Sequence, residues 1–182
     1  MTRESNLGKW EHHYRRLKRP GYYADPASYV TAAEFLAPCA SIEDWGCGKG
    51  GMRLHWGKGY LGVDGSASQF ADVVADLADY RSDTPGILVR HVLEHDVNWE
   101  MILANAVASF RERMVLVLFT PMQEQTTVLQ WVRGYRKVPD IGFAAADIER
   151  HFEGLIWTAR DVESKTDYGV ERIYQVERPG AS

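Results

Sequence analysis

The chain has 182 residues, of which 45% are apolar and 25% charged, and its formal net charge at pH 7 is −4. These values predict one globular domain and exclude a disordered or fibrous protein. An acidic chain lacks the basic face that displaces counterions from phosphates, so general nucleic-acid binding is not expected. No apolar run is long enough to span a membrane, and the first ten residues are polar, so we expect a cytoplasmic protein without membrane association.

The first forty residues are predicted to be helical. Trp10, Tyr14 and Leu17 recur at helical spacing. A second helix is indicated by Asp25 and Pro26, since an acidic cap followed by proline in the first turn is a typical helix start. The buried residues of this second helix are predicted to be Tyr29, Ala33 and Leu36, with Pro38 beyond its end.

From Ser41 the chain alternates short apolar runs with turns and helices, a pattern typical of β/α folds. The run 114–119 is apolar throughout, which predicts a strand that is covered on both faces, as in the centre of a parallel sheet. Strands are predicted at 42–45, 60–63, 73–75, 86–89 and 114–119, helices at 50–56, 99–110 (capped by Asn98), 127–135 and 144–153, and a terminal antiparallel pair of strands at 155–159 and 170–176.

A glycine-dense turn follows the first predicted strand. Glycines adopt positive φ and let the backbone approach a ligand closely, and a helix that begins beyond them offers free N–H groups. Gly46, Gly48 and Gly51 satisfy the pattern Gly-x-Gly-x-x-Gly. This pattern indicates nucleotide binding only when a strand precedes it and a helix follows, as predicted here.

Acidic residues follow the next two predicted strands. Asp64 ends the second strand and Asp76 the third, and the stretch 91–96 follows the fourth. Ligands of open parallel sheets bind outside the carboxyl ends of the strands, so these positions should lie together. Asp64 lies 18 residues after Gly46 (64 − 46), near the separation at which an acidic side chain accepts both ribose hydroxyls.

Residues from about Ser41 to Thr120 resemble the class I S-adenosylmethionine-dependent methyltransferases, particularly the compact ones that act on small molecules. The resemblance implies a Rossmann-like three-layer sandwich, with a seven-stranded, mostly parallel sheet whose last strand is antiparallel. It also implies one cofactor-binding domain over 41–178, with residues 1–40 as a helical cover on the acceptor side. The segments that carry the resemblance are 42–50, 61–64, 74–77 and 91–95.

The resemblance assigns cofactor contacts position by position, with S-adenosylmethionine as cofactor and S-adenosylhomocysteine as product. The glycine turn would lie against the methionine and ribose, with Asp44 orienting the turn and the methionine ammonium. Asp64 would hold the ribose hydroxyls, Asp76 the adenine amino group, and the backbone near His91 the ammonium. The cofactor-binding residues implied in this way are Asp44, Gly46, Cys47, Gly48, Asp64, Gly65, Asp76, Leu77, Arg90 and His91.

Methyl transfer is an in-line displacement, so the enzyme mainly holds the acceptor in a near-attack position. A base is needed only when the acceptor is a hydroxyl or an ammonium group. His91, His95 and Glu94 are the candidates, because they follow the fourth strand and histidine titrates in the useful range. Tyr14 and neighbouring aromatic residues would close over the site, where an aromatic face favours the sulfonium.

Each candidate also has an interpretation without chemistry. Asp64 and Asp76 suit turns or helix caps, and Glu94 with His95 can simply begin the next helix. The spacing His91-x-x-Glu94-His95 also suits a metal site, but short clusters of this kind usually hold none, and we expect no metal.

Two other functions remain open. A nicotinamide-dependent oxidoreductase would use the same glycine turn, but the carboxylate of Asp44 would repel a pyrophosphate, and no Tyr-x-x-x-Lys pattern follows the glycine turn. The second alternative is a non-catalytic regulatory module that binds S-adenosylmethionine. The Asp/Asn-Pro-Pro-aromatic and Pro-Cys patterns of DNA methylation do not occur after the fourth predicted strand, so the expected acceptor is a small molecule.

Overall fold

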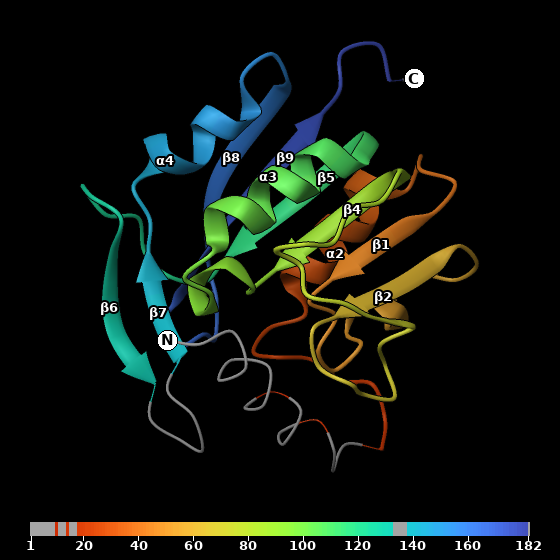
Figure 1. Ribbon diagram of the computed structural model, residues 1–182, viewed down its shortest axis with the longest axis horizontal. Coiled ribbons are helices and arrows are strands. Elements are labelled where there is room, and N and C mark those ends of the chain that lie inside the picture. Colours follow the sequence, from red (N-terminus) through yellow and green to blue (C-terminus); the bar gives the residue numbers. More distant parts are fainter. Residues whose placement is uncertain (1–9, 11–13, 15–17, 133–137, 182) are drawn as a thin grey trace.

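The structure is a computed structural model that describes Trp10, Tyr14, 18–132 and 138–181. Its main sheet has seven strands in the order β3-β2-β1-β4-β5-β9-β8 (Figure 1). The first five are parallel, whereas β9 runs antiparallel to both of its neighbours. The predicted sheet, including its antiparallel last strand, is therefore confirmed. The strands are β1 Ile42–Trp45, β2 Tyr60–Asp64, β3 Val73–Val74, β4 Thr84–Arg90, β5 Phe110–Leu118, β8 Ile156–Glu163 and β9 Val170–Glu177.

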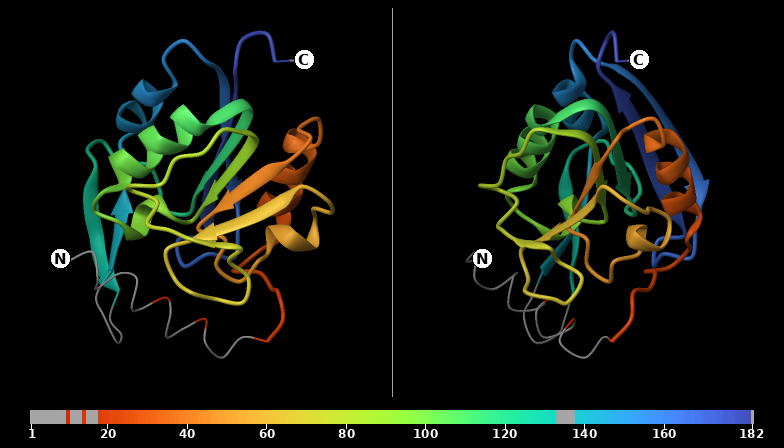
Figure 2. Two further views of the ribbon diagram at one scale, coloured as in Figure 1. Left: turned by 45° about the vertical axis from the view of Figure 1, so that its right-hand side comes forward. Right: turned by 90° about the vertical axis from the view of Figure 1, so that its right-hand side faces the viewer.

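Helices cover both faces of this sheet. The apolar strand β5 alternates between two cores: Met114 and Leu116 pack with helix α3 (Trp99–Ser109), and Val115 packs with helix α2 (Ala27–Leu36). The edge-on view in Figure 2 shows α2 and α3 on opposite sides of the strands. A strand inside such a three-layer sandwich must be apolar on both faces, which explains the unbroken apolar run.

The helix predicted at 50–56 is wrong. Only a 3-10 turn, η1 (Met52–Leu54), lies between β1 and β2. Four of the six residues from Gly46 to Gly51 are glycines, which lose the most conformational entropy in a helix. The connection therefore begins with a glycine turn at the end of β1 and continues through η1 to β2.

The helix predicted at 127–135 is also wrong, and Tyr135 lies outside the described residues. Strand β6 (Thr127–Val132) pairs antiparallel with β7 (Val138–Gly142) as a separate two-stranded sheet. Figure 1 shows this hairpin beside the N-terminal end of α3. The β-branched residues of β6 and Trp131 favour a strand, and this preference outweighs the helical spacing of its apolar positions.

The other predicted elements differ mainly at their ends. Helix α2 begins at Ala27 with Pro26 as its N-cap residue, one position later than predicted, although Oδ1 of Asp25 accepts a hydrogen bond from the N–H of Ala27 at 2.8 Å. The side chain of Asn98 makes no capping bond, and the backbone of Phe110 belongs to β5. The helix predicted at 144–153 is a short α4 (Ala145–Glu149) followed by η3 (Arg150–Phe152). Among the described residues, no helix has both the length and the apolarity to cross a membrane.

Candidate active site

A cavity of about 390 Å³ opens at the carboxyl ends of the parallel strands. It lies where the order of the strands places the glycine turn, Asp64 and the stretch after β4. Three predicted site residues, Asp44, Gly48 and Glu94, do not line it. Those that do are Tyr14, Gly46, Cys47, Asp64, Gly65, Asp76, Leu77, Arg90, His91 and His95.

Two glycines of this turn have backbone conformations that other residues rarely adopt. Gly46 has φ of +75°, and a Cβ there would lie 2.3 Å from Cγ2 of Val92. Gly48 also has positive φ, and its N–H donates to Oδ2 of Asp64 at 2.9 Å. The turn is thus tied to the end of β2, and its backbone forms one wall of the cavity.

Asp64 and Asp76 both make the turn hydrogen bonds that the sequence offered as the alternative to ligand contact. Oδ1 of Asp64 accepts from the N–H of Ser66 at 2.8 Å, and Oδ1 of Asp76 accepts from the N–H of Ala78 at 2.9 Å. Both residues also line the cavity. A carboxylate oxygen has two lone pairs, so these turn bonds leave acceptor capacity for a ligand. Burial raises the pKa of Asp64, although hydrogen bonds from Ser66 and Gly48 oppose the shift.

Asp44 is buried and does not reach the cavity, contrary to the expected contact with a ligand. Its Oδ2 accepts a hydrogen bond from the hydroxyl of Tyr60 at 2.8 Å. Burial raises the pKa of Asp44 to about 7. A carboxyl with this pKa carries less than a full negative charge near neutral pH, so it would repel a pyrophosphate less than the sequence indicates.

Glu94 is fully buried and also faces away from the cavity. Its Oε1 accepts from the N–H of Phe119 at 2.6 Å, so it holds the chain that leaves β5. Burial raises the pKa of Glu94 to about 7. The structure therefore gives Glu94 a place beneath the site, and not the exposed position that a general base needs.

His91 follows β4 with φ of +56°, a left-handed conformation that is uncommon for residues other than glycine. Its Nε2 lies 2.6 Å from Oε1 of Glu171. Burial lowers the pKa of His91 to about 4, even though Glu171 opposes the shift. The ring is therefore neutral at pH 7, with the proton on Nε2, because a carboxylate can only accept.

His95 is held on the other side of the cavity by the β6–β7 hairpin. Its Nδ1 lies 3.0 Å from the carbonyl oxygen of Pro139 and 3.2 Å from Oδ1 of Asp140. Since a carbonyl only accepts, Nδ1 carries the proton, and in the neutral ring the lone pair is on Nε2. Burial by itself would raise the pKa of Asp140, but hydrogen bonds from His95 and Gln130 hold it below its ordinary value.

Aromatic rings form the walls between these groups. The ring of Phe119 lies 4.9 Å from that of His91 and 5.2 Å from that of His95, measured between centroids. The ring of Trp10 lies 5.2 Å from that of His95. This half of the cavity therefore combines aromatic rings with polar side chains such as Asp140 and Thr166, as small-molecule sites usually do.

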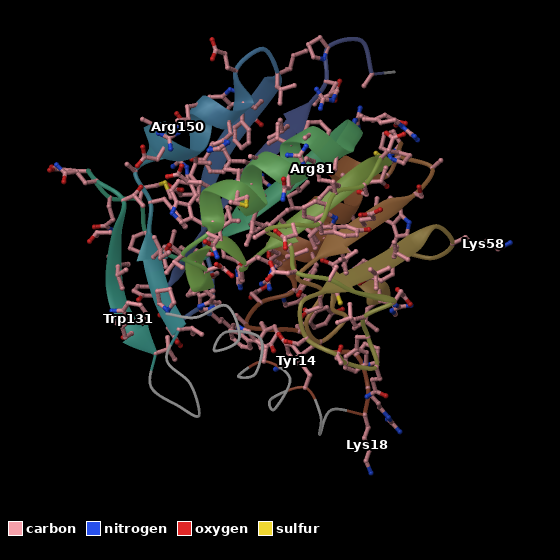
Figure 3. The ribbon with its side chains drawn as sticks, viewed as in Figure 1. Tyr14, Lys18, Lys58, Arg81, Trp131 and Arg150 are labelled. Carbon is pink, nitrogen blue, oxygen red and sulfur yellow. The ribbon has the colours of Figure 1, made fainter. Side chains whose placement is uncertain are left out.

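The N-terminal segment contributes to the cavity through Tyr14 and Tyr23. A Cβ on Gly48 would lie 3.1 Å from Oη of Tyr14 and 3.2 Å from Cε2 of Tyr23. Burial and the charge of Asp64 raise the pKa of Tyr14 well above its ordinary value, so its hydroxyl stays protonated. In Figure 3, Tyr14 lies beneath the sheet, whereas the exposed side chain of Lys18 points away from the body of the molecule.

Sequence reasoning missed the two carboxylates that hold the histidines. Glu171 lies on β9 and Asp140 on β7, and neither belongs to a local motif. It also missed Phe119 and the segment 165–167, which lines the cavity from the β8–β9 connection. Within the described part of the chain, no group of three or more His, Cys, Asp or Glu residues is placed to hold a metal ion.

A scan of the sequence against family models gives no match, and a search of curated proteins gives none either. Solved structures do match. Magnesium protoporphyrin IX methyltransferase (ChlM) from Synechocystis PCC 6803, with bound S-adenosylhomocysteine, is 16% identical, with a TM-score of 0.65 over 97% of this chain and 98% of that one.

Two further solved structures resemble the chain. The 1,6-didemethyltoxoflavin-N1-methyltransferase of Burkholderia thailandensis, with its acceptor and S-adenosylhomocysteine, is 14% identical, with a TM-score of 0.62 over 85% of this chain and 79% of that one. The complex of DhpI with S-adenosylhomocysteine is 16% identical, with a TM-score of 0.59 over 97% of each chain. The chain therefore has the Rossmann-like fold of the class I S-adenosylmethionine-dependent methyltransferases.

Proposed function

We propose that the chain is an S-adenosylmethionine-dependent methyltransferase that methylates an oxygen, nitrogen or carbon atom of a small-molecule acceptor. The observation that carries this proposal is the sequence of groups along the cavity. In the order β3-β2-β1-β4, the strands are followed by Asp76, Asp64, the Gly46 turn and His91. The neighbouring structures that contain S-adenosylhomocysteine support the same ligand.

The cofactor is elongated, and its donor groups match these positions in order. We place the adenine at Asp76 and the backbone of Leu77, and the ribose hydroxyls on the remaining lone pairs of Asp64. The methionine part then lies along the turn at Gly46 and reaches the end of β4 at His91. Gly46 and Cys47 line the cavity at this turn, and the absence of a side chain at Gly46 lets a ligand approach the backbone closely.

His95 is the residue that we assign as general base. When bound, S-adenosylmethionine supplies a methyl group that its positive sulfur makes electrophilic. The acceptor would lie between Trp10 and Phe119, and Nε2 of His95 would take its proton. Pro139 and Asp140 hold the ring in the tautomer that this transfer needs.

Tyr14 and Tyr23 form part of the cover that excludes water from the transfer. Because its hydroxyl stays protonated, we assign Tyr14 to hydrogen-bond donation and to packing against the cofactor, and not to proton removal. We therefore keep the proposal of an acceptor-side cover for the part of residues 1–40 that precedes α2, because α2 itself packs on a face of the sheet.

Calorimetric titration of the purified chain tests the proposal. S-adenosylmethionine and S-adenosylhomocysteine should bind with Kd values on the order of micromolar, and NAD should not compete. Asp64→Ala should abolish binding, whereas Asp83→Ala, which removes an exposed carboxylate far from the cavity, should leave it unchanged. Preferential binding of NAD, or equal binding by the Asp64→Ala variant, would sink the proposal.

A further inference from the structure

A buried ion network connects the last strand of the sheet to the cavity. Oε1 of Glu171 accepts from Nη2 of Arg90 at 2.7 Å, from Nε2 of His91 at 2.6 Å and from Oγ of Ser28 at 3.2 Å. Glu171 is 0% exposed and Arg90 is 5% exposed. Three segments that are distant in the sequence therefore meet on one carboxylate oxygen.

Stability alone does not explain this network. Buried ion pairs lose much of their attraction to desolvation, and apolar residues of the same volume often serve equally well. In addition, Oε2 of Glu171 is buried and has no hydrogen-bond partner within the described part of the chain. Such an atom costs free energy, and groups of this kind concentrate at functional sites.

The network determines which nitrogen of His91 faces the cavity. Glu171 stays ionised, since the hydrogen bond from His91 and the charge of Arg90 hold the pKa of Glu171 below its ordinary value despite burial. An ionised carboxylate only accepts, so the proton of the neutral ring is on Nε2 and the lone pair is on Nδ1. His91 lines the cavity and Glu171 does not. Nδ1 is therefore the nitrogen that is available to a ligand, as an acceptor.

The position of His91 indicates which ligand donor it meets, on the basis of the proposed function. The cofactor carries three kinds of donor: the adenine amino group, the ribose hydroxyls and the methionine ammonium. Asp76 and Asp64 stand at the ends of β3 and β2, and His91 stands beyond β1 at the end of β4. With the first two donors placed on the carboxylates, the ammonium is the donor left for the β4 end.

We propose that Glu171 is a positioning residue for cofactor binding: through its hydrogen bond with Nε2, it holds His91 so that Nδ1 accepts a hydrogen bond from the methionine ammonium. His91 and His95 then have different tasks, the first binding the cofactor and the second removing a proton from the acceptor. The two tasks match their opposite tautomers, which are fixed by Glu171 on one side and by Pro139 on the other.

Calorimetry with two ligands tests this proposal. S-adenosylhomocysteine carries the ammonium, whereas 5′-methylthioadenosine lacks the whole amino-acid part. Glu171→Gln should weaken S-adenosylhomocysteine about tenfold, the effect of one hydrogen bond to a charged group, and change 5′-methylthioadenosine less than twofold. Glu177→Gln, which removes another β9 carboxylate in a half-buried pair with Arg113, should change neither ligand.

The outcomes separate the possible failures. Equal weakening of both ligands, or no weakening, would overturn the role of Glu171. Failure of the unchanged chain to bind S-adenosylhomocysteine would instead overturn the proposed function. If Glu171→Gln does not fold, His91→Asn serves as the second variant, because asparagine tolerates the left-handed backbone, and it should show the same selective loss.

The tautomer of His91 gives a readout that a purely structural role would not change. Nitrogen-15 NMR of the unchanged chain should show His91 protonated on Nε2 and His95 protonated on Nδ1. In Glu171→Gln, the signals of His91 should shift toward a mixture of tautomers, and those of His95 should stay as they were. A His91 ring protonated on Nδ1 in the unchanged chain would contradict the proposal.

Discussion

The two halves of the cavity are built in different ways. The half assigned to the cofactor comes from turns that directly follow β1, β2, β3 and β4, between residues 46 and 91. The half assigned to the acceptor comes from Trp10, the β6–β7 hairpin and the β8–β9 connection, which are far apart in the sequence. The residues assigned to the cofactor are thus determined by local sequence at the strand ends. The residues assigned to the acceptor come together only because distant segments pack against one another.

The largest expected effect is in the cofactor half, at Gly46→Ala. The new methyl group would lie 2.3 Å from Cγ2 of Val92, on a backbone with φ of +75°. We expect a loss of roughly 2 kcal/mol or more in the free energy of unfolding, and a loss of S-adenosylhomocysteine binding of about 100-fold. Urea unfolding and calorimetry measure the two. Gly57→Ala, where the added Cβ meets open space, is the matched control and should behave as the unchanged chain does.

Asp140→Asn should affect the acceptor half alone. It removes the carboxylate beside Nδ1 of His95, which stabilises the positive charge that the ring gains when it takes a proton, while the carbonyl of Pro139 still accepts from Nδ1. S-adenosylhomocysteine affinity should stay within about twofold, whereas turnover of an acceptor found by screening should fall about 100-fold. Asp161→Asn, on the exposed β8, is the control. If binding fell along with turnover, the division of the cavity into two halves would be wrong.

Glu94→Gln should change how stability depends on pH. Burial raises the pKa of Glu94 to about 7 from an ordinary value of 4.5. The folded chain therefore binds this proton more tightly, and the stability it provides is present below pH 4.5 and lost as the pH rises through 7. The loss is about 1.4 kcal/mol per unit between these values.

Glutamine keeps an oxygen for the N–H of Phe119 but does not titrate. Between pH 5 and pH 7.5, Glu94→Gln should therefore lose about 2 kcal/mol less stability than the unchanged chain. Urea unfolding at both pH values measures this difference. Parallel stability curves for the two proteins would show that Glu94 does not titrate in this range.

The smallest expected effect is that of Tyr168→Phe. Its hydroxyl donates to Oδ2 of Asp140 at 3.2 Å and accepts from Nε2 of Gln130 at 3.0 Å, at the rim of the acceptor half. Loss of these partly exposed bonds should cost about 0.5–1 kcal/mol, or a decrease of about 1–4 °C in Tm. Cofactor affinity should not change. A decrease above 8 °C would mean that the β8–β9 connection stabilises the whole fold.

The same contrast explains what the sequence could and could not predict. Asp64 and Asp76 were found because each directly follows an apolar run that becomes a strand, and strand ends meet at one edge. The partner of His91 is 80 residues away and that of His95 about 45, so no local pattern identifies Glu171 or Asp140. The residues of β6 suit either a helix or a strand by periodicity, and only pairing with β7 decides.

Two residues lie near strand ends, as the sequence predicts, but their side chains do not reach the cavity. Asp44 and Glu94 belong to the stretches that carry the resemblance, yet both are buried beneath the cavity. Spacing indicates that a side chain is near a strand end, but it does not indicate which way the side chain points. The turn bonds of Asp64 and Asp76 were likewise left open by the sequence, which offered them as an alternative to ligand contact.

A crystal structure of the chain with S-adenosylhomocysteine tests the central claim most directly, because it shows the direction in which the ligand lies. We expect the adenine beside Asp76, the ribose hydroxyls on Asp64, and the ammonium within hydrogen-bond distance of Nδ1 of His91. The sulfur should face the space between His95 and Phe119. A ligand bound in the reverse direction, or outside this cavity, would contradict the division of the site into a cofactor half and an acceptor half.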